Sequence, residues 1–282
     1  MDGIIIVNKP KGYTSRDIVN IVSKCVGTKK VGHTGTLDPM ATGVLIVCIG
    51  KATKLVDLLI SKYKEYIAEV TLGIQTDTLD LEGNVLKQEN VFVSDEEIKD
   101  AVLSFKGKYI QEVPIFSAVR VDGKKLYEYA REGIEVKLPK REVDIKNISL
   151  IDIERTENIK FKFKAEVSKG TYIRSLVNDI ASRLNTIGVM SSLERTMQGI
   201  FNIEDSYTIE DIKNGNYKIM SIEDTLKDIY SVDMDDNLYK KVSNGVKIKD
   251  TYNKDLILFK YNGKAIALYQ KDNDILKIYK ML

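Results

Sequence analysis

The chain has 282 residues, of which 43% are apolar and 30% are charged, a composition typical of a globular protein with room for one large and one small domain. Its first residues reach Lys9 and Pro10 after only four consecutive apolar positions, too few for a signal peptide or a membrane span, so a cytoplasmic protein with no membrane partner is expected. Two cysteines, Cys25 and Cys48, and a single histidine do not supply a zinc site, and both thiols are expected to be buried and reduced.

The net charge of +2 is unevenly distributed along the chain. Residues 201–236 contain ten acids and three lysines, a local charge of −7, so the remainder of the chain carries +9. A surplus of this size suits a polyanion such as nucleic acid, although an evenly spread excess is also common on solvated surfaces. Charge alone therefore leaves the partner open, and the acidic segment is expected to face away from any RNA.

The first quarter of the chain predicts strands that alternate with helices. Residues 3–10 are expected to form a strand that ends at a Lys-Pro turn. A helix follows, which Thr14 or Ser15 would cap and Gly27 would end. The next segments, in chain order, are a polar loop over 31–43, a buried strand over 44–50, an amphipathic helix over 51–62 and a half-exposed strand over 63–73.

The middle of the chain continues this mixture. Ser94 and Glu97 have the spacing of a capping box, which predicts the start of a helix. Further predicted elements are a helix over 124–133, strands over 142–154 and 159–170, and a helix over 171–185. Runs of neighbouring strands interleaved with helices favour an α+β fold over a doubly wound parallel sheet.

Residues 201–282 change character. Residues 201–231 predict an acidic and mostly helical connector, which would close a large domain over 1–231. From Val232 the pattern predicts short strands with Asn-Gly turns, hence a small β-barrel or sandwich over 232–282. Ten lysines and seven acids make this second domain mildly basic.

The residues themselves exclude several kinds of catalytic site. His33 is the only histidine and no GxSxG stretch accompanies it, so a nucleophilic triad is not supported. The spacing of a phosphate loop and a GxGxxG after a strand are both absent from the sequence, so nucleotide-cofactor chemistry is poorly supported. The remaining candidate is Asp38, an isolated acid in the glycine-rich loop that precedes an apolar strand.

Asp38 can be interpreted in two ways. It can form an Asx turn with a structural role only. It can also act as a nucleophile, which requires a cationic neighbour and a pocket supplied by other segments. Arg174, at a predicted strand-to-helix junction, is a plausible neighbour, although an isolated arginine is more often on the surface.

The stretch GHTGTLDPMATGVL, residues 32–45, resembles the signature of the TruB family, the bacterial pseudouridine synthases that modify uridine 55 in the TΨC arm of transfer RNA. The resemblance extends over nearly the whole chain, in the family's order. It implies a mixed, largely antiparallel central sheet with flanking helices, the pseudouridine synthase fold, and a C-terminal PUA-like RNA-binding domain. The matching segments are 3–15, 51–59, 64–83, 116–136, 167–180 and the C-terminal strands, with Arg120 where relatives often carry Lys.

The resemblance also implies roles for individual residues. Asp38 is the expected nucleophile, Arg174 its ionic partner, and Tyr66 the aromatic side chain that stacks on the flipped uracil, each of which could otherwise be an ordinary structural residue. Attack on C1′ of the ribose, attack on C6 of the base and a glycal route all remain open, and none needs a cofactor. The expected substrate-binding residues are His33, Tyr172, Leu193, Lys9 and Lys64, with packing or a structural turn as the alternative for each.

The implied substrate is tRNA, bound at its TΨC arm and acceptor stem by a monomer. A uridine inside a folded loop must be flipped out, at a cost of roughly a few kcal/mol, before C1′ and C5 can be reached. Phosphate contacts would give an affinity that weakens with salt. The candidate lysines are Lys29, Lys30, Lys64, Lys124 and Lys125, each of which could instead be merely solvated.

Two competing interpretations remain. A guide-RNA-dependent synthase of the dyskerin type shares the aspartate motif, but it would be expected to carry N-terminal extensions and a larger PUA domain, so no guide RNA is expected. A non-catalytic protein that binds or folds tRNA would not need Asp38, Tyr66 and Arg174 together. Family members can fold tRNA as well as modify it, so both activities can coexist.

Overall fold

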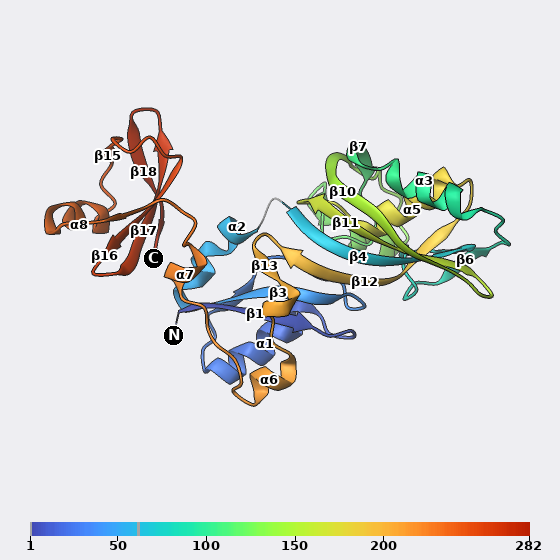
Figure 1. The fold of residues 1–282 in the computed structure, drawn as a ribbon, viewed down its shortest axis with the longest axis horizontal. Helices are drawn as coiled ribbons and strands as arrows, with labels where there is room; N and C mark the ends of the chain where they lie inside the picture. Colours follow the sequence, from blue (N-terminus) through green and yellow to red (C-terminus); the bar gives the residue numbers. More distant parts are fainter. Residues whose placement is uncertain (1, 61–62) are drawn as a thin grey trace.

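The computed structural model describes residues 2–60 and 63–282, which form a nine-stranded sheet and, beside it, a five-stranded C-terminal sheet (Figure 1). Among the described strands of the large sheet all neighbours are antiparallel except β3 and β12. Across it lie β1 (Gly3–Lys9), β3 (Thr42–Ile49), β12 (Gly188–Gln198), β4 (Tyr63–Leu72), β11 (Ile159–Ser168), β10 (Lys140–Arg155) and β7 (Gly107–Glu112), with β2 (Val31–His33) beside β3 and β13 (Phe201–Asn202) beside β12. The predicted mixed, largely antiparallel sheet is confirmed.

Strand β1 shows why the first part of this sheet, β1 and β3, is buried on both faces. Ile5 and Val7 pack with helix α1 (Ser15–Val26), whereas Ile4 and Ile6 face the opposite way, toward the C-terminal sheet. This alternation follows from the two-residue period of a strand. Helix α1 begins and ends where the sequence predicts, with a capping box at Thr14 and a left-handed Gly27.

Two further helices cover the other half of the sheet. Helix α3 (Asp95–Leu103) begins with the predicted capping box at Ser94, and α5 (Ile173–Arg183) follows strand β11. Their apolar side chains share one core cluster with strands β4, β10, β11 and β12. Leu37 and Met40, which flank Asp38, belong to the same cluster.

The acidic segment covers the open edge of strand β1. Tyr207 exchanges backbone hydrogen bonds with Ile6 and Asn8, and Met220 does so with Ile4. Ile209 and Ile212, in helix α6 (Ile209–Lys213), are buried against the α1 side. An exposed strand edge invites pairing with other chains, so this segment closes the edge while its acids remain outside.

The C-terminal sheet has the order β14 (Ser231–Asp233), β16 (Leu256–Tyr261), β17 (Lys264–Asp272), β18 (Ile275–Met281) and β15 (Ile248–Lys249). The predicted hairpin between β16 and β17 is confirmed, because Asn262 and Gly263 have the positive φ values, 51° and 75°, of a tight two-residue turn. The second predicted Asn-Gly turn is wrong: Asn244 and Gly245 end a helix, α8 (Asp236–Ser243), that the strand pattern did not predict. The helix has only eight residues and lies between strand-like segments, so its amphipathic pattern is too short to stand out in the sequence.

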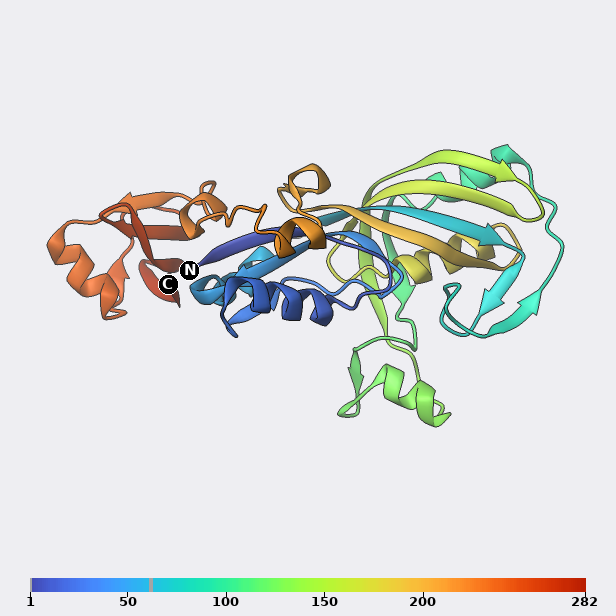
Figure 2. The same cartoon turned by 90° about the horizontal axis from the view of Figure 1, so that it is seen from below.

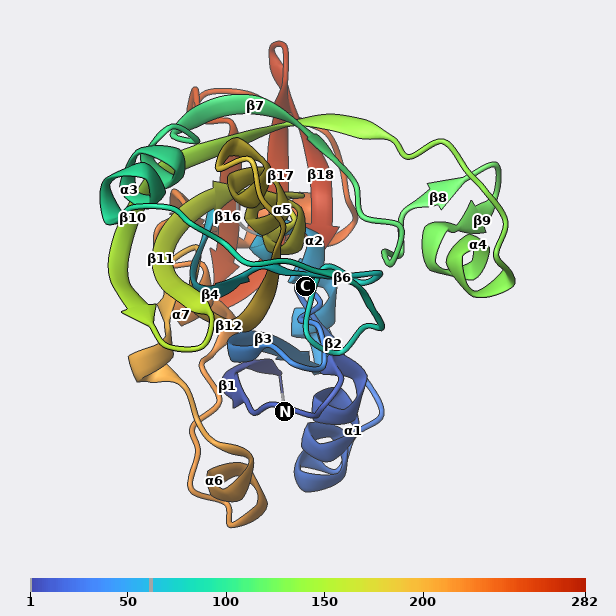
Figure 3. The same cartoon turned by 90° about the vertical axis from the view of Figure 1, so that its right-hand side faces the viewer.

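A helical arm projects from the body of the protein (Figures 2 and 3). It consists of the short strands β8 (Arg120–Val121) and β9 (Lys124–Lys125) and helix α4 (Leu126–Glu132), which ends at Gly133 as predicted. A smaller hairpin, β5 (Ile74–Thr76) with β6 (Val85–Gln88), follows strand β4. No helix in the described part of the chain combines the length and the apolar character needed to cross a bilayer.

Three other predictions need correction. The helix predicted over 51–62 is a 3-10 helix, η1 (Gly50–Leu55), followed by the one-turn helix α2 (Val56–Leu59), and its last two residues lie outside the described ones. The connector over 201–231 is mostly irregular, because its residues serve the edge of β1. Its helices are η2 (Ile203–Asp205), α6 and α7 (Ile222–Thr225). Cys48 is buried as expected, but Cys25 is exposed, because it lies on the solvent face of α1.

We expect the two sheets to unfold together. Leu258 and Leu268 of the C-terminal sheet are fully buried in one cluster with Ile4 and Ile6 of the large sheet. Leu268→Ala should therefore lower the free energy of unfolding by about 2–5 kcal/mol in a single urea transition. The control, Ile278→Ala, removes a side chain that is 41% exposed and should have a small effect. Two separate transitions, only one of them shifted, would contradict this expectation.

Candidate active site

Asp38 lies in the loop between β2 and β3, and other segments hold this loop at several points. The hydroxyl of Ser15 accepts a hydrogen bond from Leu37 N at 2.9 Å and donates to Leu37 O at 3.3 Å. On the other side of Asp38, the carbonyl oxygen of Pro39 accepts hydrogen bonds from Gly12 N and from Lys9 Nζ, at 2.9 and 3.2 Å. The glycine-rich sequence thus forms a fixed loop.

Arg174, at the start of α5, lies against this loop. Its Nε is 3.1 Å from Asp38 Oδ2, while Nη1 and Nη2 donate to the carbonyl oxygens of Thr78 and Phe116 at 3.0 and 3.1 Å. The Arg174 side chain is 7% exposed and the Asp38 side chain is 37% exposed. The carbonyl groups of Thr78 and Phe116 therefore hold the guanidinium in place, and one side of the Asp38 carboxylate is open to a ligand.

A second carboxylate, that of Asp80, also lies beside the Arg174 guanidinium. The sequence did not point to Asp80 as a residue of the site. Its Oδ2 is 3.8 Å from Arg174 Nε, and its Oδ1 accepts hydrogen bonds from Thr78 Oγ1 at 2.7 Å and from Glu82 N at 3.1 Å. Asp80 is buried in the turn that connects β5 and β6. A buried acid needs a cation nearby, but only the structure shows that Asp80 is buried, so the sequence carried no signal for this pairing.

Tyr66 and Leu193 form an apolar wall beside the Asp38 loop. Tyr66 on β4 lies opposite Arg195 on β12, and Leu193 lies opposite Ala68, so all four side chains point to the same face of the sheet. Tyr66 and Leu193 are each 7% exposed, and they share a core cluster with Leu37 and Met40, which flank Asp38 in the loop. An aromatic ring and aliphatic side chains thus border the carboxylate.

Tyr172 precedes helix α5 and is held by its backbone. Its N–H donates to the buried Gln111 Oε1 at 2.8 Å, and its carbonyl oxygen accepts from Gln111 Nε2 at 3.1 Å. Its ring lies 5.5 Å from the Arg141 guanidinium. These contacts fix the start of α5, one residue before the helix and two before Arg174.

His33 lies at the end of β2, near the loop. Its Nδ1 accepts a hydrogen bond from Gly35 N at 3.3 Å, so the neutral ring carries its proton on Nε2. Burial lowers the pKa of His33, and the positive charges of Arg16 and Arg195 lower it further. The sequence suggested no partner that could orient this ring, and the structure provides a backbone one.

Lys9 and Lys64 are cations in confined positions. Lys9 is fully buried and donates to the carbonyl oxygens of Pro10, Tyr13 and Pro39. Burial lowers its pKa to about 8, against the nearby charge of Asp38. Lys64 lies on the same strand face as Tyr66, and burial, with the charges of Arg195 and Lys169, lowers its pKa to about 8.

The other candidate lysines lie farther out. Lys29 and Lys30 are exposed in the loop between α1 and β2. Lys124 and Lys125 belong to the arm, where Lys124 pairs with Glu132 and Lys125 donates to Tyr127 Oη. Arg120, also in the arm, donates to Gly123 O. The candidate lysines therefore lie in three places: beside the Asp38 loop, in the arm, and in the loop that follows α1.

The arrangement suits reversible covalent chemistry on a neutral, flat substrate group. It provides one accessible carboxylate, a buried cation beside it and an aromatic ring in the wall. Within residues 2–60 and 63–282, no three side chains of the metal-binding types converge on a common point.

Residues 23–173 match the family model described as TruB family pseudouridylate synthase (N terminal domain). A tRNA pseudouridine synthase B from Clostridium tetani is 42% identical, with 100% of both chains covered. The same enzyme from Caldanaerobacter subterraneus subsp. tengcongensis is 44% identical over 95% of this chain and 94% of its own. A chain in the crystal structure of a Cbf5-Nop10-Gar1 complex superposes with a TM-score of 0.73, at 24% identity, over 99% of this chain and 84% of that chain, a likeness in fold.

The lowered pKa of Lys64 predicts a pH-dependent effect of its removal. Between pH 8 and 10.5 the unfolded chain keeps a proton on Lys64 that the folded chain has lost, so this group makes the folded state more stable as pH rises. Lys64→Met removes the buried charge, so it should stabilise the protein most at pH 7, and less as pH approaches 10.5. Urea unfolding of both proteins at each pH measures the difference. A difference that does not change with pH would contradict the assignment.

Proposed function

This chain belongs to the TruB family of pseudouridylate synthases and acts on tRNA, and from that premise we propose that it isomerises uridine 55 of the TΨC loop. The observation that carries the proposal is the half-exposed carboxylate of Asp38 held 3.1 Å from the buried Arg174 guanidinium. The reaction breaks the bond between N1 and C1′, rotates the uracil and joins C5 to C1′. The proton leaves C5 and N1 gains one, so no oxidant, reductant or cofactor is consumed.

Asp38 is the proposed nucleophile. It would attack C1′ of the ribose or C6 of the base, or would assist a glycal route by removing a proton, and each route needs one carboxylate beside the target nucleotide. Arg174 supplies the neighbouring positive charge, which the carboxylate needs both before attack and when it leaves. The fixed loop around Asp38 keeps the carboxylate in place, which reduces the entropic cost of reaching the transition state.

Tyr66 is proposed to stack on the flipped uracil, with Leu193 and Tyr172 as the remaining walls of the pocket. The burial of Tyr66 and Leu193 beside the Asp38 loop supports this, because a base leaves the helical stack only when it gains comparable contacts elsewhere. His33, with a donor at Nε2, would wedge into the RNA loop rather than act as a general base. Lys9 would keep the adjoining turn in shape.

The tRNA would be bound over an extended surface by a monomer that works without guide RNA or membrane, in the cytoplasm. Lys64 and the lysines of the arm and of the α1–β2 loop would contact phosphates of the TΨC arm. Residues 232–282, a mildly basic sheet proposed to be a PUA-like domain beside the catalytic domain of 1–231, would contact the acceptor stem. The acidic connector, on the outer edge of β1, would lie away from the RNA.

The proposed chemistry predicts that Asp38→Asn loses activity and keeps tRNA binding. Tritium release from a transcript labelled at uridine C5, in EDTA and without cofactor, should fall by roughly 10⁴-fold or more, because an amide cannot replace a nucleophilic carboxylate. The affinity for tRNA should stay within a few-fold of the wild type, since Asp38 makes no buried structural contact of its own side chain other than that with Arg174 among the described residues.

A transcript with cytidine at position 55 is the control for the substrate position, and it should release no tritium with the wild-type enzyme. Binding without release by either protein would mean that the chain binds or folds tRNA only. Release from the cytidine-55 transcript would place the modified uridine elsewhere.

The proposed phosphate contact of Lys64 predicts a change in salt dependence. Lys64→Met should reduce the slope of log Kd against log salt concentration by about 0.7–0.9, the value for one lost contact. The matched control is Lys162→Met, since Lys162 pairs with Glu69 on the opposite face of the same sheet. Equal slopes in wild type and Lys64→Met would exclude the contact.

A further inference from the structure

The large sheet consists of two parts, and the proposed catalytic groups come from both. Asp38 belongs to the part formed by β1, β2 and β3. Tyr66 and Leu193 belong to β4 and β12, and Arg174 to α5, which packs against these two strands. The angle and distance between Asp38 and its partners therefore depend on how the two parts are joined.

The join itself is short. Among the described residues the parallel ladder between β3 and β12 consists of Thr42 with Glu194 and Gly43 with Arg195. The backbones approach so closely that a Cβ on Gly43 would lie 2.2 Å from Arg195 O, so glycine is required there. A ladder of this length gives little resistance to rotation of one part against the other.

The Arg195 side chain crosses this join. It is 0% exposed, its Nε donates to Val44 O at 2.7 Å, and its Nη2 donates to Gly35 O at 3.2 Å. Gly35 lies three residues before Asp38 and Val44 six residues after it, so one guanidinium from β12 holds both ends of the Asp38 loop. Gln198 adds a contact on the same side, from Nε2 to Thr34 Oγ1 at 2.6 Å.

Burial of the Arg195 charge lowers the stability of the folded protein. Its described partners are carbonyl oxygens rather than carboxylates, and its Nη1 has no hydrogen-bond partner among residues 2–60 and 63–282. A buried charge that no opposite charge neutralises costs more than an apolar side chain of similar volume. The guanidinium carries its donors in a rigid planar fork, so Nε and Nη2 of Arg195 reach the two carbonyl groups in fixed directions.

We infer that Arg195 is a positioning residue for the reaction: it fixes the Asp38 loop of one sheet part against the Tyr66 and Arg174 part. The inference rests on the proposed function, because it assigns the alignment of that same site. Arg195 does not touch the substrate and acts through the backbone on both sides of Asp38. A displacement of a reacting group by about 1 Å can cost roughly 100-fold in rate.

The test uses the full chain with the variants Arg195→Met and Arg195→Lys. The single-turnover rate of pseudouridine formation at saturating tRNA should fall roughly 100-fold in Arg195→Met and by at least roughly tenfold in Arg195→Lys, because a lysine ammonium lacks the rigid planar fork that fixes the directions of the two carbonyl contacts. The Kd for tRNA should stay within about threefold. The NMR signal of His33, the only histidine, should shift in both variants, because Gly35 binds its ring and Arg195 lowers its pKa.

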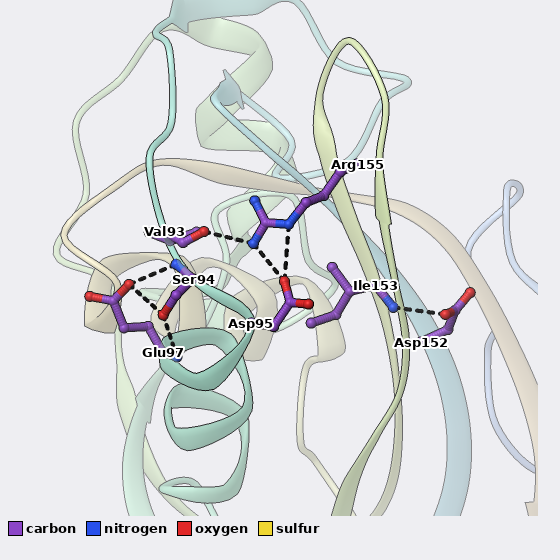
Figure 4. A network of polar contacts seen from close by, with 7 residues as sticks. All are labelled: Val93, Ser94, Asp95, Glu97, Asp152, Ile153 and Arg155. Atoms are coloured by element: carbon purple, nitrogen blue, oxygen red, sulfur yellow. Dashed lines mark hydrogen bonds and ion pairs between the residues drawn. The ribbon is translucent and has the colours of Figure 1, made fainter.

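Arg155→Met is the matched control. Arg155 also joins two segments, since it donates to Val93 O and to Asp95 Oδ1 near the start of α3 (Figure 4), and its strand, β10, is separated from β12 by β4 and β11. Its loss should leave the single-turnover rate and the His33 signal unchanged. If Arg195→Met does not fold, as urea unfolding will show, Arg195→Lys decides.

Several results would overturn the inference. They are a wild-type rate in Arg195→Lys, a weakened tRNA Kd with an unchanged rate at saturation, or an equal loss of rate in Arg155→Met. A wild-type protein that forms no pseudouridine would be a failure of the proposed function, which the same assay reports separately.

Discussion

The contact between Arg174 and Asp38 governs the arrangement of the site. A guanidinium that is 7% exposed cannot remain without acceptors, and here every nitrogen is engaged, by the carbonyl oxygens of Thr78 and Phe116 and by two carboxylates. Asp80 is the buried carboxylate and Asp38 the half-open one. This asymmetry separates a structural acid from an acid that can meet a substrate.

The fold explains how one arginine can reach both acids. Helix α5 packs on the same sheet face as Tyr66, so its first turn points at the loop between β2 and β3 and at the turn between β5 and β6. Gln111 holds Tyr172 and thereby the start of α5. Ser15, Lys9 and Arg195 hold the Asp38 loop from three other segments, so the carboxylate is fixed although its own sequence is flexible.

The distribution of charge has a structural explanation as well. The acidic connector uses its apolar residues and backbone to close the edge of β1, which leaves its carboxylates on the outside. Cations gather where the two parts of the large sheet meet, and there burial and the charge of Arg195 lower the pKa of Lys9 and of Lys64. The net charge of +2 is therefore the sum of an acidic region and a basic region that lie apart in the fold. This separation of charge matters for a polyanionic substrate.

Features whose causes are local could be predicted from the amino-acid sequence. The capping boxes at Thr14 and Ser94, the end of α1 at Gly27 and the hairpin at Asn262 and Gly263 depend on residues within a few positions of each other, and the structure contains all of them. The amphipathic patterns also predicted most strands and the α+β class. Short helices such as α8 and the irregular connector were mispredicted, because tertiary contacts rather than propensity decide such short segments.

The distant residues that support Asp38 could not be predicted in this way, because the fold brings them together. In the sequence Asp80 lies 42 positions from Asp38, and Arg195 lies 157 positions from it. Neither residue belongs to a local sequence pattern that predicts its partner. These residues come close to the Asp38 loop because of the order of strands in the sheet, which places β12 between β3 and β4. A buried charge finds its partners through space, so the sequence can supply the chemical groups, whereas the fold decides which of them meet.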